Sequence, residues 1–315
     1  MPIDRSWKCS CRRHAMPPVE VIVRKDAVKD VTPTMKKLGA AGQCLVVHDA
    51  NTKKVAGDAI LDLLRKDGWS AKEVIVERPD EVNVEKVVSQ LRTSDFLVGV
   101  GGTSVLDIAK LAASKKEAKY LLFSTGLANS GIVSKTASIY VKGRKESIAV
   151  TVADAVIVDL TIIAAAPTWM VPAGCGDLVI ETTAIKDWQL GRDEDHEPYC
   201  DSIGELEMST LDQILRNAEE IRARSTHGIE SLVDSLIVSG LGMASWGSSR
   251  PSSGSEHLWS HWLDHHAPPG RHGEQVGVGT LLMAKYSIPP ITAIRNASEK
   301  VRCLLLARIS LMVSA

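Results

Sequence analysis

The sequence predicts an α/β domain with a parallel sheet, followed by an all-helical domain. Short β-branched runs alternate with helical stretches over the first half, which is typical of parallel strands buried on both faces. After Asp159 these runs give way to Leu, Ala, Glu and Ile at three- and four-residue intervals. The chain has 315 residues, and single hydrophobic cores stop growing at roughly 250 to 300 residues. We therefore expect two domains, 1–166 and 167–315, with the boundary near Pro167.

Hydrophobic periodicity predicts the individual elements. Six short apolar runs predict the strands of the parallel sheet: 19–23, 44–47, 73–76, 96–100, 120–123 and 155–158. Apolar residues at helical spacing predict helices within 51–67, 84–92, 210–224 and 228–240. Residues 138–150 place Lys142, Gly143 and Arg144 between two alternating segments, which predicts a β-hairpin. Residues 191–207 are acidic and contain Gly and Pro, which predicts an exposed loop.

Composition and charge argue against several classes of partner. Hydrophobic residues make up 44% and charged residues 24%, the balance of a soluble globular protein. With 37 basic and 38 acidic residues, the net charge of −1 gives nucleic acid no attracting field. No run reaches the roughly 20 apolar residues of a spanning helix, and residues 1–20 lack the apolar core of a secretory signal. We expect a cytoplasmic protein that binds a small molecule, with no nucleic acid and no membrane insertion.

The cysteines give no metal or disulfide pattern. The six cysteines form no CxxC pair and show no regular spacing, which argues against a zinc ribbon or a disulfide framework. The N-terminal Cys9-Ser10-Cys11, with Arg12, Arg13 and His14, could bind a metal. We expect a mobile tail there instead.

A glycine turn opens a helix in the first half. Residues 95–110 read DFLVGVGGTSVLDIAK, so that a buried strand runs through Gly99, Gly101 and Gly102 directly into a helix. Such a turn exposes backbone N–H groups at the positive end of the helix dipole, which suits a pyrophosphate. The spacing is neither GxGxxG nor a Walker loop. A tight turn without a ligand remains the alternative.

A carboxylate and two imidazoles form a candidate metal set in the second half. Asp177 lies in AGCGDLV, His257 in SGSEHLWSHWLD and His272 in RHGEQVGVG. These ligand types suit divalent zinc or iron and leave positions open for substrate. An isolated histidine is more often a surface or core residue, so spacing alone does not decide. HLWSH lacks the glutamate of the HExxH motif, which disfavours a metalloprotease.

A third candidate region is the small-residue loop 123–134, FSTGLANSGIVS, at the end of a predicted strand. Two glycines, Gly126 and Gly131, stand among the hydroxyls of Ser124, Thr125, Ser130 and Ser134. Ligands of open α/β sheets bind at the carboxyl ends of strands. An ordinary loop would have a similar composition.

Four strings together resemble a known superfamily: GGTSVLDIAK, CGDLVIETTAIKDWQL, GSSRPSSGSEHLWSHWLD and HGEQVGVGTLL. They are similar to the iron-containing alcohol dehydrogenases and dehydroquinate synthases, and most closely to the sn-glycerol-1-phosphate dehydrogenases. The resemblance implies a dehydroquinate synthase-like fold, with a Rossmann-like domain before an all-α domain. It implies reduction of dihydroxyacetone phosphate to sn-glycerol 1-phosphate with NADH or NADPH, a step of archaeal membrane lipid synthesis. It also implies one Zn²⁺ per subunit, with Fe²⁺ or Ni²⁺ as other candidates, and a homo-oligomer.

By position, the resemblance places the metal ligands on Asp177, His257 and His272, with Asp177 and His261 also at the substrate. His261, or a water that it holds, would deliver the proton to the reduced ketone. The dinucleotide contacts fall on Gly101, Gly102, Thr103, Ser104, Val105, Thr125, Gly126, Leu127, Ala128 and Ser134. We add the hypothesis that Arg250 binds the substrate phosphate, the alternative being that it braces the Ser-rich turn around it.

The sequence also departs from this family. Asn129-Ser130 stands where the family carries His-Asp, so Ser130 offers a hydroxyl without charge to the substrate. Thr103 replaces the third glycine of the phosphate loop, and the resemblance ends after Met283, so the C-terminus looks shortened. A catalytically impaired homologue that keeps cofactor or metal binding, or a glycerol or polyol dehydrogenase, is therefore the alternative. Asp49, after an early strand, predicts a preference for NADH.

Overall fold

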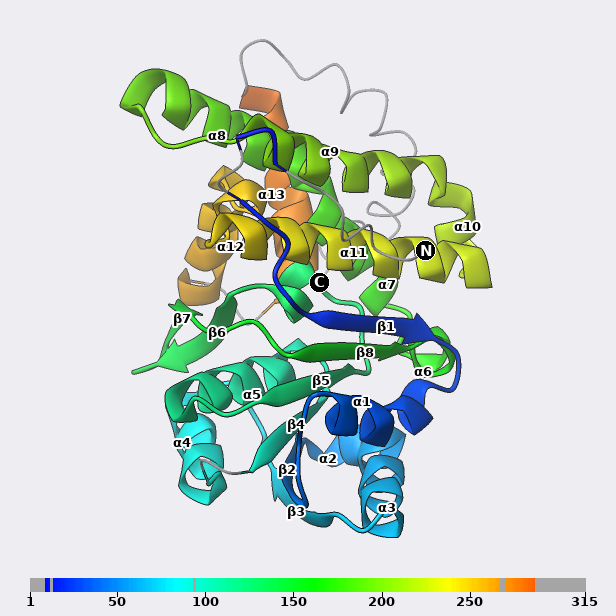
Figure 1. Cartoon of the computed structure of the whole chain (residues 1–315). Helices are drawn as coiled ribbons and strands as arrows, with labels where there is room; N and C mark the ends of the chain where they lie inside the picture. Colours follow the sequence, from blue (N-terminus) through cyan, green and yellow to red (C-terminus); the bar gives the residue numbers. More distant parts are fainter. Residues whose placement is uncertain (1–8, 12–13, 93–94, 267–269, 287–315) are drawn as a thin grey trace. The chain divides into compact units, whose positions relative to one another are not determined.

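The computed structural model describes residues 9–11, 14–92, 95–266 and 270–286 (Figure 1). The chain forms two compact units. The α/β unit comprises Pro17–Gly126 and Gly131–Ala166, and the helical unit comprises the described residues of Met1–Met16, Leu127–Ser130 and Pro167–Ala315. The expected succession of an α/β part with a parallel sheet and a helical part is confirmed. The helical unit also takes in two segments, from residues 1–16 and 127–130, that sequence alone groups with the first domain.

The α/β unit is built on a six-stranded sheet in the order β1-β8-β5-β4-β2-β3, with every neighbouring pair parallel. The strands are β1 (Glu20–Arg24), β2 (Gln43–His48), β3 (Ser70–Ile75), β4 (Phe96–Gly101), β5 (Tyr120–Ser124) and β8 (Ala155–Asp159). All six predicted strands are present. β3 begins earlier than predicted. It is an edge strand whose residues are largely exposed, so polar residues interrupt the apolar run from which a strand is predicted.

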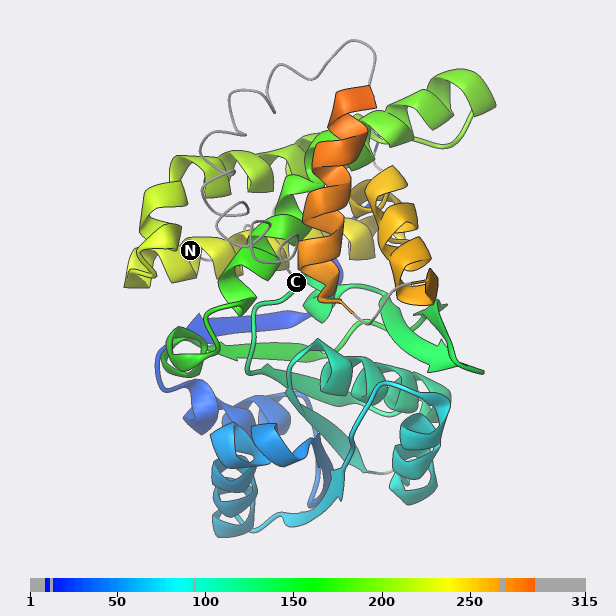
Figure 2. The ribbon, with the colours of Figure 1, turned by 180° about the vertical axis from the view of Figure 1, so that it is seen from behind.

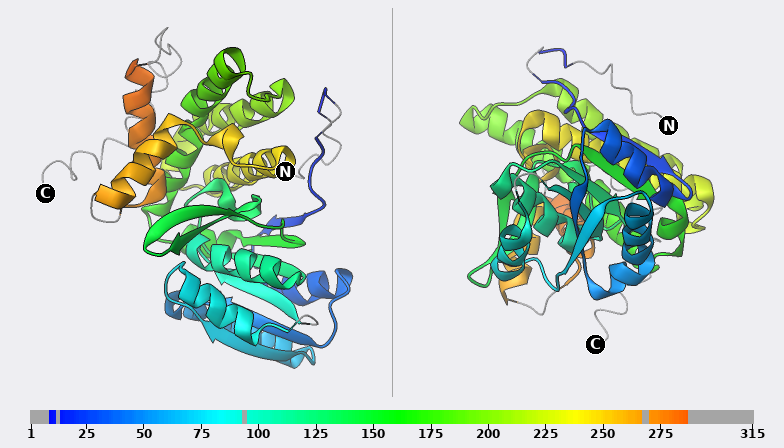
Figure 3. Two further views of the ribbon diagram at one scale, coloured as in Figure 1. Left: turned by 90° about the vertical axis from the view of Figure 1, so that its left-hand side faces the viewer. Right: turned by 60° about the horizontal axis from the view of Figure 1, so that its bottom comes forward.

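Helices cover both faces of this sheet, as a parallel sheet requires. One face packs against α1 (Val31–Lys37) and α3 (Asp58–Lys66), where Met35 and Ile60 join Val98 in one apolar core. α4 (Glu81–Gln90) and α5 (Thr103–Lys116) lie on the other face, toward the viewer in the left view of Figure 3. The shorter elements are η1 (Ala27–Asp30), α2 (Ala50–Thr52), η2 (Lys53–Gly57) and α6 (Leu160–Ala165).

The predicted hairpin is confirmed as a separate two-stranded antiparallel sheet. It consists of β6 (Thr136–Val141) and β7 (Arg144–Ala149), joined through Lys142 and Gly143. Both turn residues have positive φ, 50° and 82°, which is the geometry of a two-residue hairpin turn and explains the glycine.

The helical unit contains α7 (Met170–Val179), α8 (Glu181–Asp195), α9 (Asp201–Arg216), α10 (Ala218–Arg222), α11 (Thr226–Trp246), η4 (Arg250–Ser252), α12 (Ser255–His266) and α13 (His272–Tyr286). The remaining element, η3 (Ser130–Val133), begins at the end of its 127–130 segment. α13, orange in Figure 2, packs against α7 and α12, while α9 packs against α11. Among the described residues, no helix combines the length and the apolar character that crossing a bilayer requires.

Two expectations about the helical unit are wrong. Residues 191–207 are not one exposed loop, because α8 runs to Asp195 and α9 begins at Asp201. Most of their acidic side chains face solvent, although Glu207 is buried, and Cys200 and Ile203 are buried beside Trp188 and anchor the segment. The N-terminal segment is not a mobile tail in its described residues, since Cys9 belongs to the same buried cluster.

Candidate active site

The three residues predicted as metal ligands converge within the helical unit. Asp177 lies on α7, His257 on α12, and His272 is the first residue of α13. One ligand atom from each of the three lies within 4.8 Å of the others. The Nε2 atom of His272 is 3.5 Å from Oδ1 of Asp177, and the two imidazole rings are 5.0 Å apart.

Two glycines allow α7 and α13 to approach closely enough for this convergence. A methyl group on Gly176 would overlap the carbonyl oxygen of Gly273, and one on Gly273 would overlap the carbonyl oxygen of Ala173. Any side chain at either position would separate the two backbones. The glycines therefore position the neighbouring residues, Asp177 and His272, to face each other.

Asp177 is buried and held by Ser130, the first residue of η3. Its Oδ2 atom accepts hydrogen bonds from the backbone N–H and the hydroxyl of Ser130, both at 2.8 Å. Its Oδ1 atom is the one that lies near His272. Burial raises the pKa of Asp177, while His257 and the Ser130 hydrogen bonds act in the opposite direction. Ser130, predicted as a substrate contact, thus orients a candidate metal ligand.

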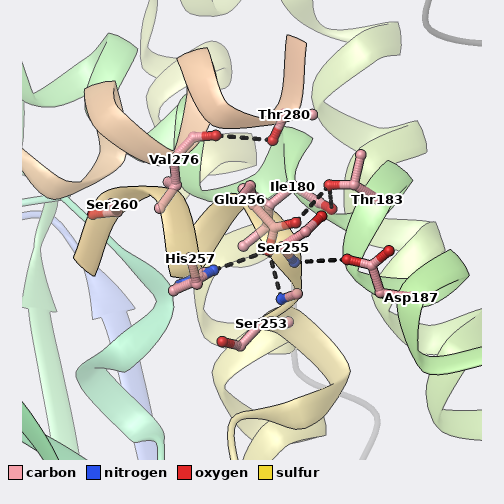
Figure 4. A network of polar contacts seen from close by, with 12 residues as sticks. Ile180, Thr183, Asp187, Ser253, Ser255, Glu256, His257, Ser260, Val276 and Thr280 are labelled. Atoms are coloured by element: carbon pink, nitrogen blue, oxygen red, sulfur yellow. Dashed lines mark hydrogen bonds and ion pairs between the residues drawn. The ribbon is translucent and has the colours of Figure 1, made fainter. Parts of the chain in front are cut away.

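His257 is oriented by the residue before it. Its Nδ1 atom lies 3.0 Å from Oε1 of Glu256, which also accepts from the backbone N–H of Gly254 at 2.6 Å (Figure 4). The other Glu256 oxygen accepts from the Thr183 hydroxyl at 2.7 Å. Burial alone would raise the pKa of Glu256, but the hydrogen bonds from His257, Thr183 and Gly254 together hold that pKa below its ordinary value. An ionised Glu256 keeps the proton on Nδ1 and leaves Nε2 for a metal.

A similar contact orients His272. Its Nδ1 atom lies 3.2 Å from the Ser260 hydroxyl, which donates to Oε1 of Gln275 at 2.9 Å. Because Ser260 uses its proton for Gln275, it accepts from His272, and this fixes the proton on Nδ1. Both imidazoles can therefore present Nε2. Sequence reasoning missed Glu256 and Ser260, although a carboxylate directly before His257 was a visible signal.

These residues fit a divalent cation. One carboxylate and two neutral imidazoles with supporting hydrogen bonds form the three-ligand set that is typical of catalytic rather than structural zinc sites. These residues do not include His261, which was predicted to deliver the proton. His261 lies four residues after His257, on the same face of α12.

Arg250 is engaged within the protein. Its guanidinium forms a bidentate ion pair with Glu197, at 2.7 and 2.9 Å, and donates to the carbonyl oxygens of Asp187 and Ser253. Four of its five N–H groups are thereby used. This arrangement favours the bracing role over the phosphate-binding hypothesis.

The predicted phosphate loop joins β4 to α5 within the α/β unit. Gly101 ends β4, and Gly102 caps α5 in an extended conformation. No atom lies within 4 Å of the point where a Cβ atom on Gly102 would be. The approach to the N-terminus of the helix is therefore clear. The N–H groups of Val105 and Leu106 donate to the carbonyl oxygen of Gly102, which is where the intrahelical bonds begin. Those of Thr103 and Ser104 lie ahead of them and fit a phosphate.

The second predicted cofactor segment begins beside this loop. The N–H of Thr125 donates to the Gly101 carbonyl at 3.0 Å, and the hydroxyl of Ser124 donates to the carbonyl of Gly126. Leu127 and Ala128, the rest of this segment, belong to the helical unit, where the carbonyl of Leu127 lies against Gly174 of α7.

A buried lysine that sequence reasoning missed braces the loop after η3. Lys110 donates to the carbonyl of Gly131 at 2.7 Å, to the carbonyl of Thr136, and to the hydroxyl of Ser134. It also pairs with Asp107, one turn earlier, at 3.5 Å. Burial lowers the pKa of Lys110 and raises the pKa of Asp107, while their mutual attraction opposes both shifts. The signal was a charged pair three residues apart in the otherwise apolar part of α5, residues 105–113.

Asp49 has a structural role that accounts for its position. It is the N-cap of α2, and its carboxylate accepts from the N–H groups of Asn51 and Thr52 at 2.8 and 2.7 Å. The hydroxyl of Thr52 accepts from the N–H of Asp49 in return, which completes a capping box. This capping role explains why a carboxylate stands at position 49 without a hydrogen bond to the ribose of a cofactor.

Comparisons with known proteins agree with this fold. The sequence model of the iron-containing alcohol dehydrogenase family matches residues 22–167. Solved structures similar to the chain include a probable glycerol dehydrogenase from Sinorhizobium meliloti, at a TM-score of 0.75 and 22% identity over 91% of this chain and 83% of that one. Glycerol dehydrogenase from Schizosaccharomyces pombe gives 0.76 and 19%, over 95% and 78%. The chain has the fold of the iron-containing alcohol dehydrogenase class, and its first half matches the sequence model of that family.

Curated relatives narrow this class. A protein of Thermococcus sibiricus named glycerol-1-phosphate dehydrogenase (NAD(P)+) is 38% identical over 85% of this chain and 77% of its own length. One of Methanosarcina barkeri with the same name is 34% identical over 90% and 81%. The chain belongs to the glycerol-1-phosphate dehydrogenase family.

Proposed function

We propose that this protein reduces dihydroxyacetone phosphate to sn-glycerol 1-phosphate with NADH or NADPH, as a step in making archaeal-type glycerophospholipid backbones. Membership of the family supports the reaction. The observation that carries the proposal for this chain is the convergence of Asp177, His257 and His272 in the helical unit. A zinc ion is the proposed metal, because a hard carboxylate combined with borderline imidazoles suits it.

Asp177, His257 and His272 would hold the ion. When bound, a divalent cation supplies Lewis acidity that draws charge toward a ketone oxygen. The side chains around it determine how well it is held: Ser130 orients Asp177, Glu256 fixes the tautomer of His257, and Ser260 does the same for His272. His261 is our proposed proton donor, since its position on α12 follows that of His257 by one turn.

The α/β unit provides the proposed nucleotide site. Gly101 and Gly102 would admit the pyrophosphate to the N-terminus of α5, where the N–H groups of Thr103 and Ser104 donate to it and Val105 lies beside it. The side chain of Thr103 stands where the family has glycine and narrows this approach. Thr125, Gly126, Leu127, Ala128 and Ser134 are the further proposed contacts, Ser134 through the loop that Lys110 braces.

The test is an assay of the purified, zinc-loaded chain with dihydroxyacetone phosphate and NADH or NADPH, with the product resolved by enantiomer. We expect sn-glycerol 1-phosphate to form, and His257→Ala to abolish turnover while NADH binding, measured by fluorescence, is kept. Unphosphorylated dihydroxyacetone serves as the matched substrate. Faster reduction of that substrate would replace the proposal by a polyol dehydrogenase, and NADH binding without any reduction would indicate a catalytically impaired homologue.

A further inference from the structure

A second cluster of metal-binding side chains lies in the helical unit, away from the sequence strings of the proposed active site. It brings together Cys9, Cys11, His14 and Cys200, whose ligand atoms all lie within 4.8 Å of one another. The Sγ atom of Cys9 is 2.7 Å from that of Cys11 and 3.0 Å from that of Cys200. Nδ1 of His14 is 3.1 Å from Sγ of Cys11. Three sulfurs and one imidazole nitrogen therefore surround a common point.

Each member of the cluster is positioned by its surroundings. Cys9 and Cys200 are both 3% exposed and share an apolar core with Trp188. The ring of His14 packs on Trp246 at 4.9 Å between centroids. The residue between the two N-terminal cysteines is also fixed, because the backbone N–H of Ser10 donates to the Ser202 hydroxyl at 3.0 Å and the two hydroxyls are 2.7 Å apart.

We propose that Cys9, Cys11, His14 and Cys200 form a structural zinc site. Three thiolates and one imidazole are a standard ligand set for structural zinc, and four protein ligands leave no position for a substrate. Bonds of about 2.3 Å from zinc to sulfur put tetrahedral sulfurs roughly 3.8 Å apart, close to the 3.9 Å between Cys11 and Cys200. The two shorter sulfur contacts, Cys9 to Cys11 at 2.7 Å and Cys9 to Cys200 at 3.0 Å, would each lengthen by about 1 Å when zinc binds.

The helix that follows Cys200 fixes the position of its sulfur. Cys200 is the N-cap of α9, a helix of 16 residues. Burial, as the main cause, raises the pKa of Cys200 to about 12, so a zinc ion would have to displace the proton from this thiol. Cys9, Cys11 and Cys200 form no disulfide, so none of the three sulfurs is bonded covalently to another.

Such a site would attach the N-terminal segment to the α8–α9 connection, next to Tyr199. Cys11 and Cys200 are 189 residues apart in sequence. A cross-link that closes so long a loop removes much of the entropy of the unfolded chain. Because it uses none of the proposed catalytic residues, the inference does not depend on the proposed function.

Zinc content gives the first test. The full chain, loaded with Zn²⁺ and desalted, should contain two zinc ions per chain by plasma mass spectrometry, and Cys200→Ser should contain one. His257→Ala should also contain one, lost from the other site. Cys44→Ala is the matched control, since Cys44 is a buried cysteine of the α/β unit, and it should retain two. Equal zinc content in the wild type and Cys200→Ser would overturn the proposal.

A second measurement uses the unmodified sequence and so does not depend on whether the variants fold. An organomercurial that binds thiolates should release one zinc per chain, detected with a chromophoric indicator, while the ion held by Asp177, His257 and His272 should leave only on addition of a chelator. In the cobalt-loaded chain, sulfur-to-cobalt charge-transfer absorption should accompany the mercurial-sensitive ion. Release of no zinc by the mercurial, or a Cys9–Cys200 disulfide in place of the second ion, would contradict the site.

Discussion

At the scale of single residues, Ser130 orients the carboxylate of the candidate metal ligand Asp177. Both of its donors, the backbone N–H and the hydroxyl, bind Asp177, whereas a carboxylate at position 130 would repel it. Ser130→Ala removes one of the two hydrogen bonds. We expect metal affinity to fall by roughly 10- to 100-fold, the usual effect of losing a residue that orients a ligand.

Competition with a chromophoric chelator measures this affinity. Ser209→Ala is the control, because Ser209 is exposed on α9 and bonds only a carbonyl of its own helix. An unchanged zinc affinity in Ser130→Ala would show that the backbone N–H alone orients Asp177.

The ion pair between Arg250 and Glu197 supplies the second prediction. Their side chains are 26% and 32% exposed and form a bidentate contact, so we expect a coupling energy of roughly 1 kcal/mol in a double-mutant cycle. Arg250→Ala, Glu197→Ala and the double variant would be compared by denaturant unfolding. The bracing role also predicts that Arg250→Ala changes KM equally for phosphorylated and unphosphorylated dihydroxyacetone. A rise confined to the phosphorylated substrate would restore the phosphate-binding hypothesis.

At the scale of helices, the crossing of α7 and α13 is the feature on which the metal ligands depend. Gly176→Ala forces the two backbones apart at the position next to Asp177. We expect a loss of about 1–3 kcal/mol in unfolding free energy from overpacking, together with loss of zinc from the three-ligand site. Gly273→Ala, on the opposite helix, should have the same effect.

Ala284→Gly separates these two effects. It weakens α13 by about 1 kcal/mol through helix propensity, yet it adds no atom between the helices. Zinc retained in Ala284→Gly and lost in Gly176→Ala, with both measured by unfolding and metal content, would assign the loss to the crossing. Zinc retained in Gly176→Ala would mean that the helices can separate without moving the ligands.

The elements themselves were predictable where local pattern and tertiary environment agree. Buried parallel strands such as β4 and β5 have continuous apolar runs, and the sequence alone predicts them. The pattern places the start of β3 at residue 73 rather than at Ser70, because an edge strand carries polar residues that interrupt the apolar run. The ends of α8 and α9 were mistaken for a loop because acidic composition concealed the buried positions of Cys200 and Ile203. The acidic composition reflects the exposed face of these segments, whereas helix formation depends on the residues buried on their other face.

At the scale of the whole molecule, the sequence predicts only those residues of the candidate active site that lie in strings resembling the family. Asp177, His257 and His272 were found because each lies in a string that resembles the family. Their supporting contacts join distant positions, as Ser130 and Asp177 do across 47 residues. Cys9 and Cys200 are 191 residues apart. No spacing rule connects such pairs, because only the folded chain brings them together.

The stability of the helical unit should depend on pH through a buried carboxyl group that no motif contains. Glu207 of α9 is fully buried, and neither of its side-chain oxygens has a hydrogen-bond partner among the described residues. Burial, as the main cause, raises its pKa from 4.5 to about 8. Glu181, whose pKa is also raised by burial, lies close enough to interact with it.

The raised pKa of Glu207 determines the direction in which stability changes with pH. Between pH 4.5 and about 8 the folded protein keeps a proton on Glu207 that the unfolded chain has lost. The contribution to stability is therefore complete below pH 4.5 and is lost as the pH rises toward 8, by at most about 1.4 kcal/mol per pH unit. Glu207→Gln carries no ionisable group, so this part of the slope should disappear.

Thermal unfolding of the zinc-loaded wild type and Glu207→Gln from pH 5 to 8.5 measures the difference, and all other titrating groups are common to both. We expect Tm of the wild type to fall steadily relative to that of the variant as the pH rises. Glu205→Gln, the same substitution at an exposed position of α9, should follow the wild type. Parallel curves for the wild type and Glu207→Gln would mean that Glu207 is ionised in the folded protein throughout this range, with a counter-charge that compensates for its burial.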